Sequence, residues 1–237
     1  MPSEPPGASR AMNARDLASA VGPLPAGLAP PPGVPEAIPE AFWQALLDGY
    51  RSPPRHYHDI DHVVEVARWY QVVAREVGWT RPSEVFLAVL FHDVVYQAGA
   101  RDNEQRSAAV AVAAVQRWLD RADGGDIEAI DTGRVAHLIE LTARHGGLSV
   151  ADVDAEAALF LDCDMAVLGA PGDVYARYEQ GVAAEYLGVY PPELYAQGRR
   201  RFLHALLARE RIYLSPFFHG RLEEQARANL RDALAHA

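Results

Sequence analysis

Apolar residues recur every three or four positions along most of the chain after residue 40, with polar residues between them. This spacing places the apolar side chains on one face of a helix, so it predicts helices rather than strands. Abundant alanine favours helix further. Glycine and proline mark the ends of the segments. The expected helices span 40–51, 59–77, 83–95, 103–121, 126–144, 153–168, 172–187, 191–209 and 217–235.

The first 38 residues differ from the rest, because ten of the 17 prolines lie between Pro2 and Pro39. Proline removes backbone donors and disfavours helix in the residue before it. We therefore expect residues 1–38 to form a disordered or extended Pro-rich tail. No stretch indicates a convincing strand, and no repeat is visible. Residues 39–237 are predicted to be a single all-α domain, long enough to bury a sizeable core.

The 22 basic side chains are all arginine, and 32 acidic ones outnumber them, for a formal net charge of −10. Nucleic-acid binding needs a basic surface and membrane anchoring a polybasic segment, so neither a nucleic-acid polymer nor a membrane is expected as partner. No apolar run has the length of a spanning helix, and no signal peptide is visible. With one cysteine, Cys163, the chain is expected to be cytoplasmic. Alanine-rich helix faces would also suit a homodimer.

Two segments place histidines beside or within apolar helices. His58 and His62 are four residues apart, so a single helical turn would align them. The alternative is a polar helix start with Asp59 near its N-cap. His92 and Asp93 end an otherwise apolar segment. Burying both is costly unless they bind a metal or form a hydrogen-bonded pair in the core, and both alternatives stay open.

A third segment, Leu159–Gly169, is apolar apart from Asp162 and Asp164. Asp162 would be a natural N-cap for a helix beginning at Cys163, which explains one carboxylate better than two. Together the three segments supply imidazoles and carboxylates, a ligand set that suits Mn, Mg, Zn, Ni, Co or Fe. A divalent metal held in this way lowers the pKa of water and polarises a phosphoryl group.

At these residues the chain resembles the HD superfamily of metal-dependent phosphohydrolases, and within it the bacterial branch of predicted phosphohydrolases. The resemblance covers about residues 40–235 and implies an HD-domain helical bundle with additional C-terminal helices. It also implies that the metal ligands are His62, His92, Asp93 and Asp164, with Asp162 either orienting a ligand histidine or capping a helix. The segments that carry it are Arg55–His58, Phe91–Tyr96, Asn103–Ala108, Phe160–Gly169, Gly198–Arg199 and Ala226–Leu230.

Tyr57-His58 followed by His62 is also similar to a segment of cyclic-nucleotide phosphodiesterases, distant members of that superfamily. This likeness implies that His58 is the proton donor to the leaving oxygen, although Asp59 stands where those enzymes carry asparagine. Glu104 lies in a family-like segment and would act on water as a base or hydrogen-bond acceptor. The alternative for its segment is a helix start capped by Asp102 or Asn103.

His145 precedes two glycines at the end of a predicted helix, and it could hold a second metal, as extra histidines do in some HD enzymes. His137 would share its helix face, eight residues earlier. The alternative is a histidine stabilised by the helix dipole. Arg55, Arg199 and Arg227 are candidate phosphate ligands, because a guanidinium can pair with phosphate oxygens. Most arginines, however, are expected to coat solvated helix faces.

These features predict a metal-dependent phosphohydrolase that cleaves a phosphoester of a small phosphorylated molecule, with a nucleotide as one candidate. Two alternatives belong to other classes. A di-iron HD-type oxidase would need a second set of metal ligands, for which His145 is the best candidate. A non-catalytic nucleotide-binding HD module would bind without turnover, although the presence of every residue of the metal motif disfavours it.

Overall fold

The computed structural model describes residues 11–12, 30–35, 38–52, 55–119 and 130–236. Within these ranges the protein is all-α, as predicted, apart from the two-residue antiparallel strands β1 (Ala11–Met12) and β2 (Ile38–Pro39). The helices are α2 (Glu40–Tyr50), α3 (Ile60–Glu76), α4 (Pro82–Phe91), α5 (Asn103–Trp118), α6 (Thr132–Thr142), α7 (Ala155–Met165), α8 (Gly172–Glu185), α9 (Pro192–Leu207) and α10 (Pro216–His236), with the short 3₁₀ helices η1 (Val150–Asp152) and η2 (Ala166–Gly169). None of the described helices is long and apolar enough to cross a membrane.

The predicted Pro-rich tail lies largely outside the described residues, as does the predicted start of a helix at residue 126. Within the described part of that tail, Val34 and Ile38 are buried in the core. The hydroxyl of Ser83 also donates a hydrogen bond to the carbonyl of Pro32. Packing against the helical domain therefore begins before residue 39.

Helix α4 lies at the centre of the N-terminal half, where every residue from Ser83 to Phe91 is buried. It packs against α3, α5 and α6, so apolar side chains are needed on all of its faces rather than on one stripe. The helix ends at Phe91, four residues earlier than predicted. Two side chains one turn apart on α5 hold the segment that follows α4. Asn103 bonds to the N–H and carbonyl groups of Gln97, and Ser107 bonds to the N–H and carbonyl groups of Val95.

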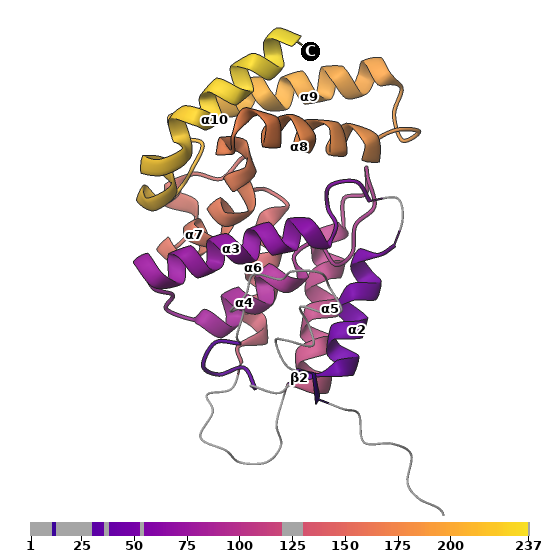
Figure 1. The fold of residues 1–237 in the computed structure, drawn as a ribbon, viewed down its shortest axis with the longest axis vertical. Helices are drawn as coiled ribbons and strands as arrows, with labels where there is room; N and C mark the ends of the chain where they lie inside the picture. The colour runs from indigo at the N-terminus through magenta and orange to yellow at the C-terminus, as the bar shows by residue number, and fades with distance from the viewer. Residues whose placement is uncertain (1–10, 13–29, 36–37, 53–54, 120–129, 237) are drawn as a thin grey trace, which may run out of the picture.

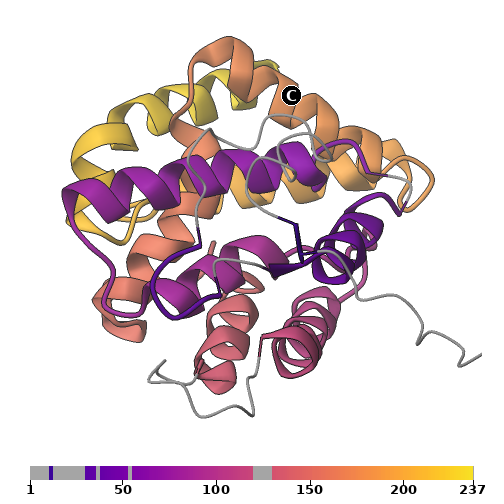
Figure 2. The same ribbon diagram turned by 60° about the horizontal axis from the view of Figure 1, so that its bottom comes forward.

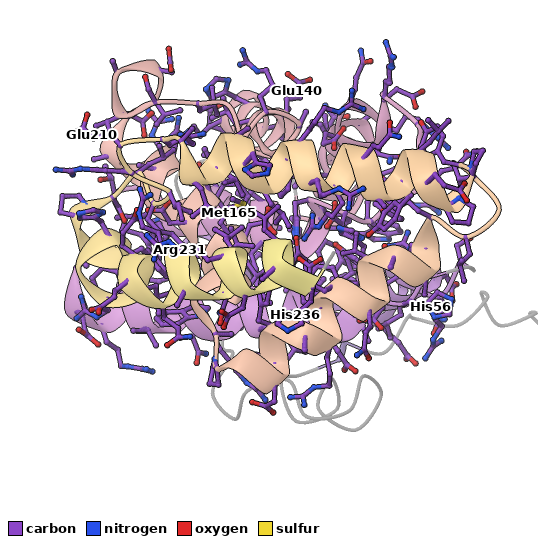
Figure 3. The ribbon with its side chains drawn as sticks, turned by 90° about the horizontal axis from the view of Figure 1, so that it is seen from above. His56, Glu140, Met165, Glu210, Arg231 and His236 are labelled. Carbon is purple, nitrogen blue, oxygen red and sulfur yellow. The ribbon has the colours of Figure 1, made fainter. Side chains whose placement is uncertain are left out.

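The C-terminal helices α8, α9 and α10 form a layer over this half (Figure 1). Figure 2 shows α3 running beneath that layer, across the middle of the molecule. Seen from above in Figure 3, the layer spreads over Met165, the last residue of α7. Gly181 allows α8 to approach the segment before α3, because a Cβ there would lie 2.8 Å from the carbonyl oxygen of His56. The fold thus brings α8 onto the first histidine segment.

Asp162 has a different role from either one predicted for it. Helix α7 begins at Ala155, after the capping side chain of Asp154, so Asp162 lies inside the helix and caps nothing on it. Its carboxylate accepts hydrogen bonds from the backbone N–H groups of Leu214 (2.8 Å) and Ser215 (2.6 Å). These residues immediately precede α10. Asp162 therefore joins α7 to the start of α10, while burial raises its pKa to about 7.

We predict that Asp162→Ala lowers the free energy of unfolding by about 3 kcal/mol, because two buried N–H groups lose their acceptor. Asp162→Asn keeps one acceptor oxygen and should cost less. Urea unfolding of the purified variants measures both changes. Asp173→Ala is the control, since Asp173 is exposed and pairs only with Arg177 on the surface, and it should change stability by less than about 0.5 kcal/mol. Equal stability of all three variants would contradict this role of Asp162.

Candidate metal centre

The first histidine segment supplies two histidines, one from within helix α3 and one from the chain before it. Asp59 is the N-cap of α3, where its carboxylate accepts hydrogen bonds from the N–H groups of Asp61 and His62. His62 is therefore in the first turn of α3, whereas His58 lies in the segment before the helix. The prediction that one helical turn aligns them is wrong, because the chain is extended at the cap. Their rings nevertheless lie near each other, with centroids 6.0 Å apart.

His92 is the C-cap residue of α4, directly after its last residue, Phe91. Its Nδ1 lies 3.0 Å from the carbonyl oxygen of Val89. A carbonyl can only accept, so Nδ1 carries the proton and the neutral ring keeps its free electron pair on Nε2. That Nε2 lies 3.1 Å from Nε2 of His62. The end of α4 thus presents a histidine in the tautomer that a metal requires at Nε2.

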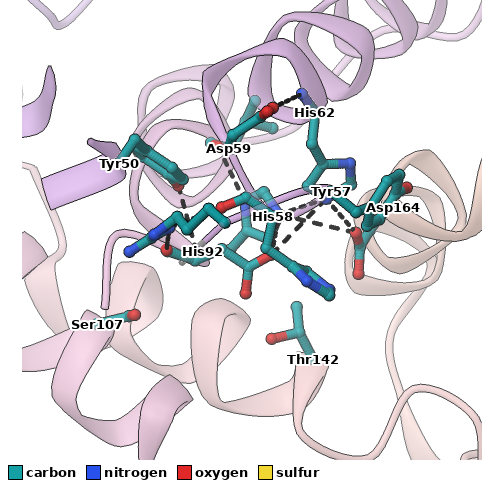
Figure 4. Close-up of polar contacts among 12 residues, drawn as sticks. Tyr50, Tyr57, His58, Asp59, His62, His92, Ser107, Thr142 and Asp164 are labelled. Carbon is teal, nitrogen blue, oxygen red and sulfur yellow. Dashed lines mark hydrogen bonds and ion pairs between the residues drawn. The ribbon is translucent and has the colours of Figure 1, made fainter. Parts of the chain in front are cut away.

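Asp164 completes the group, because α7 places its Oδ1 3.1 Å from Nε2 of His62 and 3.7 Å from Nε2 of His92 (Figure 4). The ligand atoms of these three residues lie within 4.8 Å of one another. Two donors at about 2.1 Å from one cation, at near right angles, would lie roughly 3 Å apart. His62, His92 and Asp164 are thus chemically and spatially suited to hold a divalent ion, and Asp164 is the better ligand candidate than Asp162.

Asp93 lies beside this group rather than within the compact set of three. Its Oδ2 is 3.2 Å from Nε2 of His92 and 3.7 Å from Nε2 of His62. Only 13% of its side chain is exposed. Asp93 thus lies next to both histidines but outside the group of three, and its role as a metal ligand stays a prediction.

The pKa values of His92, Asp93 and Asp164 are shifted because groups of opposite charge are buried next to one another. Burial would lower the pKa of His92, but the charge and hydrogen bond of Asp93 raise it to about 9. Burial would raise the pKa of Asp164, but hydrogen bonds from His145 and His62 hold it well below its usual range. Burial likewise opposes ionisation of Asp93, and its pKa is lowered chiefly by His92. Without a metal, a proton on His92 compensates part of the charge of the two carboxylates.

Arg55 was predicted as a phosphate ligand, and the structure contradicts this. Its guanidinium donates hydrogen bonds to the carbonyl oxygens of His58 and Asp93 at 2.7 Å, and to those of Gly49 and Val94 at 2.9 Å. Its two terminal nitrogens are thus already engaged with backbone. Arg55 instead ties the His58 segment to the end of α4, which keeps two separate parts of the site in register.

Glu185, at the end of α8, is a site residue that the sequence did not indicate. One of its carboxylate oxygens accepts hydrogen bonds from the N–H groups of His56, Tyr57 and His58 at 2.8–2.9 Å. The other lies 2.6 Å from Nδ1 of His58. Burial would raise the pKa of Glu185, but the bond with His58 lowers it to about 2. A lone glutamate at a helix end carries no motif that would reveal this contact.

A cavity of about 670 Å³, here called the front cavity, opens onto the centre. His58, Asp93 and Asp164 line it, and so do Glu104 and His145. His145 lies in the turn after α6, with Nδ1 2.9 Å from the second carboxylate oxygen of Asp164. His137 is exposed on α6, whereas His145 lies beyond the end of that helix, so the two histidines do not share a helix face as predicted. The structure thus brings both Glu104 and His145 to the cavity that the metal group faces.

The two C-terminal arginines differ in their surroundings. Arg199 lines the front cavity, but it pairs with Glu179 and donates to the hydroxyl of Tyr178 at 2.9 Å. Arg227 does not line the front cavity, and it bonds to Glu223 and to the carbonyl oxygens of Leu207, Arg209 and Glu210. The predicted phosphate contact of Arg227 is therefore wrong, because its donors hold the connection between α9 and α10. Arg199 is at the cavity with its charge already balanced.

We predict that the metal-free protein loses thermal stability as the pH rises from about 6.5 to 9. The folded-state pKa of His92 is raised, so its stabilising proton is fully present below the unfolded value and is lost as pH rises through about 9. A bound divalent metal replaces that proton, so the gain in melting temperature on adding Mn²⁺ should grow over the same interval. Differential scanning calorimetry measures both. His137→Gln should leave the gain unchanged, whereas His92→Gln should abolish it; a gain independent of pH and of His92 would contradict the assignment.

The chain was compared with protein-family models, with curated proteins and with solved structures, and no match was found. The likeness to the HD superfamily therefore rests on the motifs around His62, His92-Asp93 and Asp164, and it stays a prediction. What the described residues contain is a buried group of two imidazoles and a carboxylate, with a second carboxylate beside it, and both carboxylates line the front cavity.

Proposed function

We propose that this protein is a metal-dependent phosphohydrolase that cleaves a phosphoester of a small molecule. One observation carries the proposal: His62 of α3, His92 at the C-cap of α4 and Asp164 of α7 converge, and Asp164 also lines a cavity large enough for a small organic substrate. Mixed imidazole and carboxylate donors suit Zn, Mn, Fe, Ni or Co, and Mg to a lesser extent. When bound there, a divalent cation lowers the pKa of water and polarises phosphoryl oxygens.

The charges around the two cavities at the centre favour the front one for an anionic substrate. A second cavity of about 720 Å³, the rear cavity, also touches His62 and Asp164. Apart from the candidate metal ligands, the rear cavity is lined by three carboxylates, Asp59, Asp61 and Glu65, against Arg68 and Arg177, so it is net negative and would repel a phosphate. The front cavity is lined by one further carboxylate, Glu104, against Arg199 and Arg201. We therefore assign the phosphoester to the front cavity, which Asp93 and Asp164 both line.

His58 is suited to deliver a proton in this cavity. Its side chain is 22% exposed, and Nδ1 is held by Glu185 at 2.6 Å. The carboxylate fixes the proton on Nδ1 and leaves Nε2 to exchange a proton with the leaving oxygen. Burial would lower the pKa of His58, but the bond with Glu185 and the charges of Asp93 and Asp164 raise it. A raised pKa keeps more of the ring protonated near neutral pH, as a general acid requires.

Glu104 and His145 supply the remaining polar groups near the centre. Both line the front cavity, Glu104 from the first turn of α5 and His145 from the turn after α6. A carboxylate in that position can accept a proton from attacking water. The contact of His145 with Asp164 orients the carboxylate, which directs its other oxygen toward His62 and His92.

Purified protein assayed with phosphomonoesters, phosphodiesters and nucleotides should show hydrolysis that depends on added Mn²⁺, Mg²⁺, Ni²⁺ or Co²⁺. His92→Gln and Asp93→Asn should each lower kcat/KM by roughly 100-fold or more, because they remove metal donors. His137→Gln and Asp173→Asn are matched controls on exposed helix faces and should retain full activity. Turnover that survives the loss of His92 or Asp93, or an absence of turnover with every metal and substrate class, would sink the proposal.

Glu185→Gln should move the alkaline limb of the kcat/KM profile to lower pH, because the charge that raises the pKa of His58 is removed. The rate at the optimum should fall roughly tenfold or more, since His58 is then less firmly oriented. A profile measured between pH 5 and 10 gives both quantities. A lower rate with an unmoved limb would point to a structural role of Glu185 alone.

A di-iron oxidase is the second candidate, and one contact favours it. Asp164 faces His62 and His92 with one carboxylate oxygen and His145 with the other, which is how a carboxylate bridges two metal ions. Elemental analysis of the purified protein separates the two candidates. Two irons per chain together with no phosphoester turnover would favour the oxidase, whereas a single Mn or Zn would not.

A further inference from the structure

Aromatic side chains of the C-terminal layer line part of the front cavity. They come from α8, from the connection that follows it and from α9: Tyr178, Tyr186, Tyr190, Tyr195 and Phe202. Tyr186 is the centre of this group, with ring centroids 5.5 Å from Tyr195 and 6.0 Å from Tyr190. Asp164 of the metal group lines the same cavity, so a molecule bound at the metal can extend toward these rings.

The formal charge on this wall is compensated. The Arg199 guanidinium lies over the rings of Tyr178 (5.1 Å) and Phe202 (4.9 Å) and is paired with Glu179. Arg201 is exposed at the surface of the chain. Asn103 also lines the cavity, but its side-chain amide is hydrogen-bonded to the backbone N–H and carbonyl groups of Gln97. Apart from Arg201, the wall formed by α8, α9 and their connection therefore offers mainly ring surfaces and hydroxyls, while Glu104 lines the same cavity from α5.

One polar atom on this wall lacks a partner. The hydroxyl oxygen of Tyr195 is buried and makes no hydrogen bond to any of the described residues. A buried hydroxyl without a partner is unfavourable, and such groups in native proteins are commonly satisfied by a ligand or water. Tyr195 lines the cavity, so a bound molecule is in position to supply that partner.

Two segments approach each other tightly at Tyr190, which lines the cavity. A Cβ on Gly99 would lie 2.9 Å from the side chain of Val189 and 3.4 Å from the Tyr190 hydroxyl, so only glycine allows this contact. Gly99 also has φ of 81°, which favours glycine. The connection between α8 and α9, which carries Tyr190, is thereby held against the segment that follows α4.

We propose that this aromatic subsite binds a flat, unsaturated ring of the substrate, with the Tyr195 hydroxyl as its hydrogen-bond partner. The proposal rests on the function proposed above, which it extends to a phosphate ester whose organic part is a planar ring system. Aromatic side chains bind such rings by stacking, and a polar edge on the ring would satisfy Tyr195. A saturated sugar or chain offers no comparable face.

Binding of the organic part is tested without turnover, using adenosine and ribose as probes that contain no phosphate. Isothermal titration of the metal-loaded protein should show binding of adenosine and none of ribose. Tyr195→Phe should weaken adenosine about three- to tenfold, the loss of one hydrogen bond. Tyr195→Leu should weaken it about tenfold or more, because a stacking surface is lost as well. Tyr70→Phe is the matched control, since its hydroxyl bonds to Pro82 away from both cavities, and it should bind as the parent does.

Turnover of two similar primary esters tests the same subsite. Benzyl phosphate has a flat ring, whereas cyclohexylmethyl phosphate has a puckered one of similar size, and kcat/KM should favour the first by about tenfold. Equal metal-dependent turnover of both, or adenosine binding unaffected by Tyr195→Leu, would overturn the subsite and leave the proposed function standing. Adenosine binding that depends on Tyr195 without any phosphoester hydrolysis would support the subsite and refute the hydrolase. Absence of adenosine binding would overturn the subsite directly.

Discussion

The burial of two carboxylates against two imidazoles, at the end of an apolar helix, is the constraint on which the rest of this structure depends. Moving an ion from water into a protein interior costs several kcal/mol even after relaxation. Asp93 and Asp164 are largely buried, and so are His62 and His92, so their charges must be balanced within the group. A proton on His92 does part of this, and a divalent cation would do it too. A group that must carry compensating positive charge is preorganised for a metal.

Holding this group requires rigid surroundings, because its ligands come from helices far apart in sequence. Helix α4 is apolar on every side and is fixed by packing, which places His92 and Asp93 at its end. The segments around it have no helical hydrogen bonds of their own, so side chains satisfy their backbone. Arg55 donates hydrogen bonds to four backbone carbonyl groups, and Glu185 accepts hydrogen bonds from three backbone N–H groups. The side chains of Asn103 and Ser107 bond to the backbone of the chain after α4.

The same principle explains how the C-terminal helices take part in the site. Arg209 donates to the carbonyl oxygens of Gly146 and Leu148, which fixes the turn that carries His145. Glu185 reaches across from α8 to His58. The layer of α8, α9 and α10 therefore does more than cover the domain. It orients two histidines of the cavity and contributes the aromatic wall opposite the metal group.

The sequence by itself determined the helices and the residue types of the centre, since periodicity and glycine or proline stops depend only on local positions. It could not decide which face each side chain takes in the assembled bundle. Asp162 and Asp164 are two apart on α7, so they point in different directions, one toward α10 and the other toward the histidines. Arg55 and Arg227 looked like phosphate ligands until the fold placed backbone carbonyls around them. Glu185 became a site residue only through contact with a segment about 130 positions earlier, because tertiary packing alone brings such distant groups together.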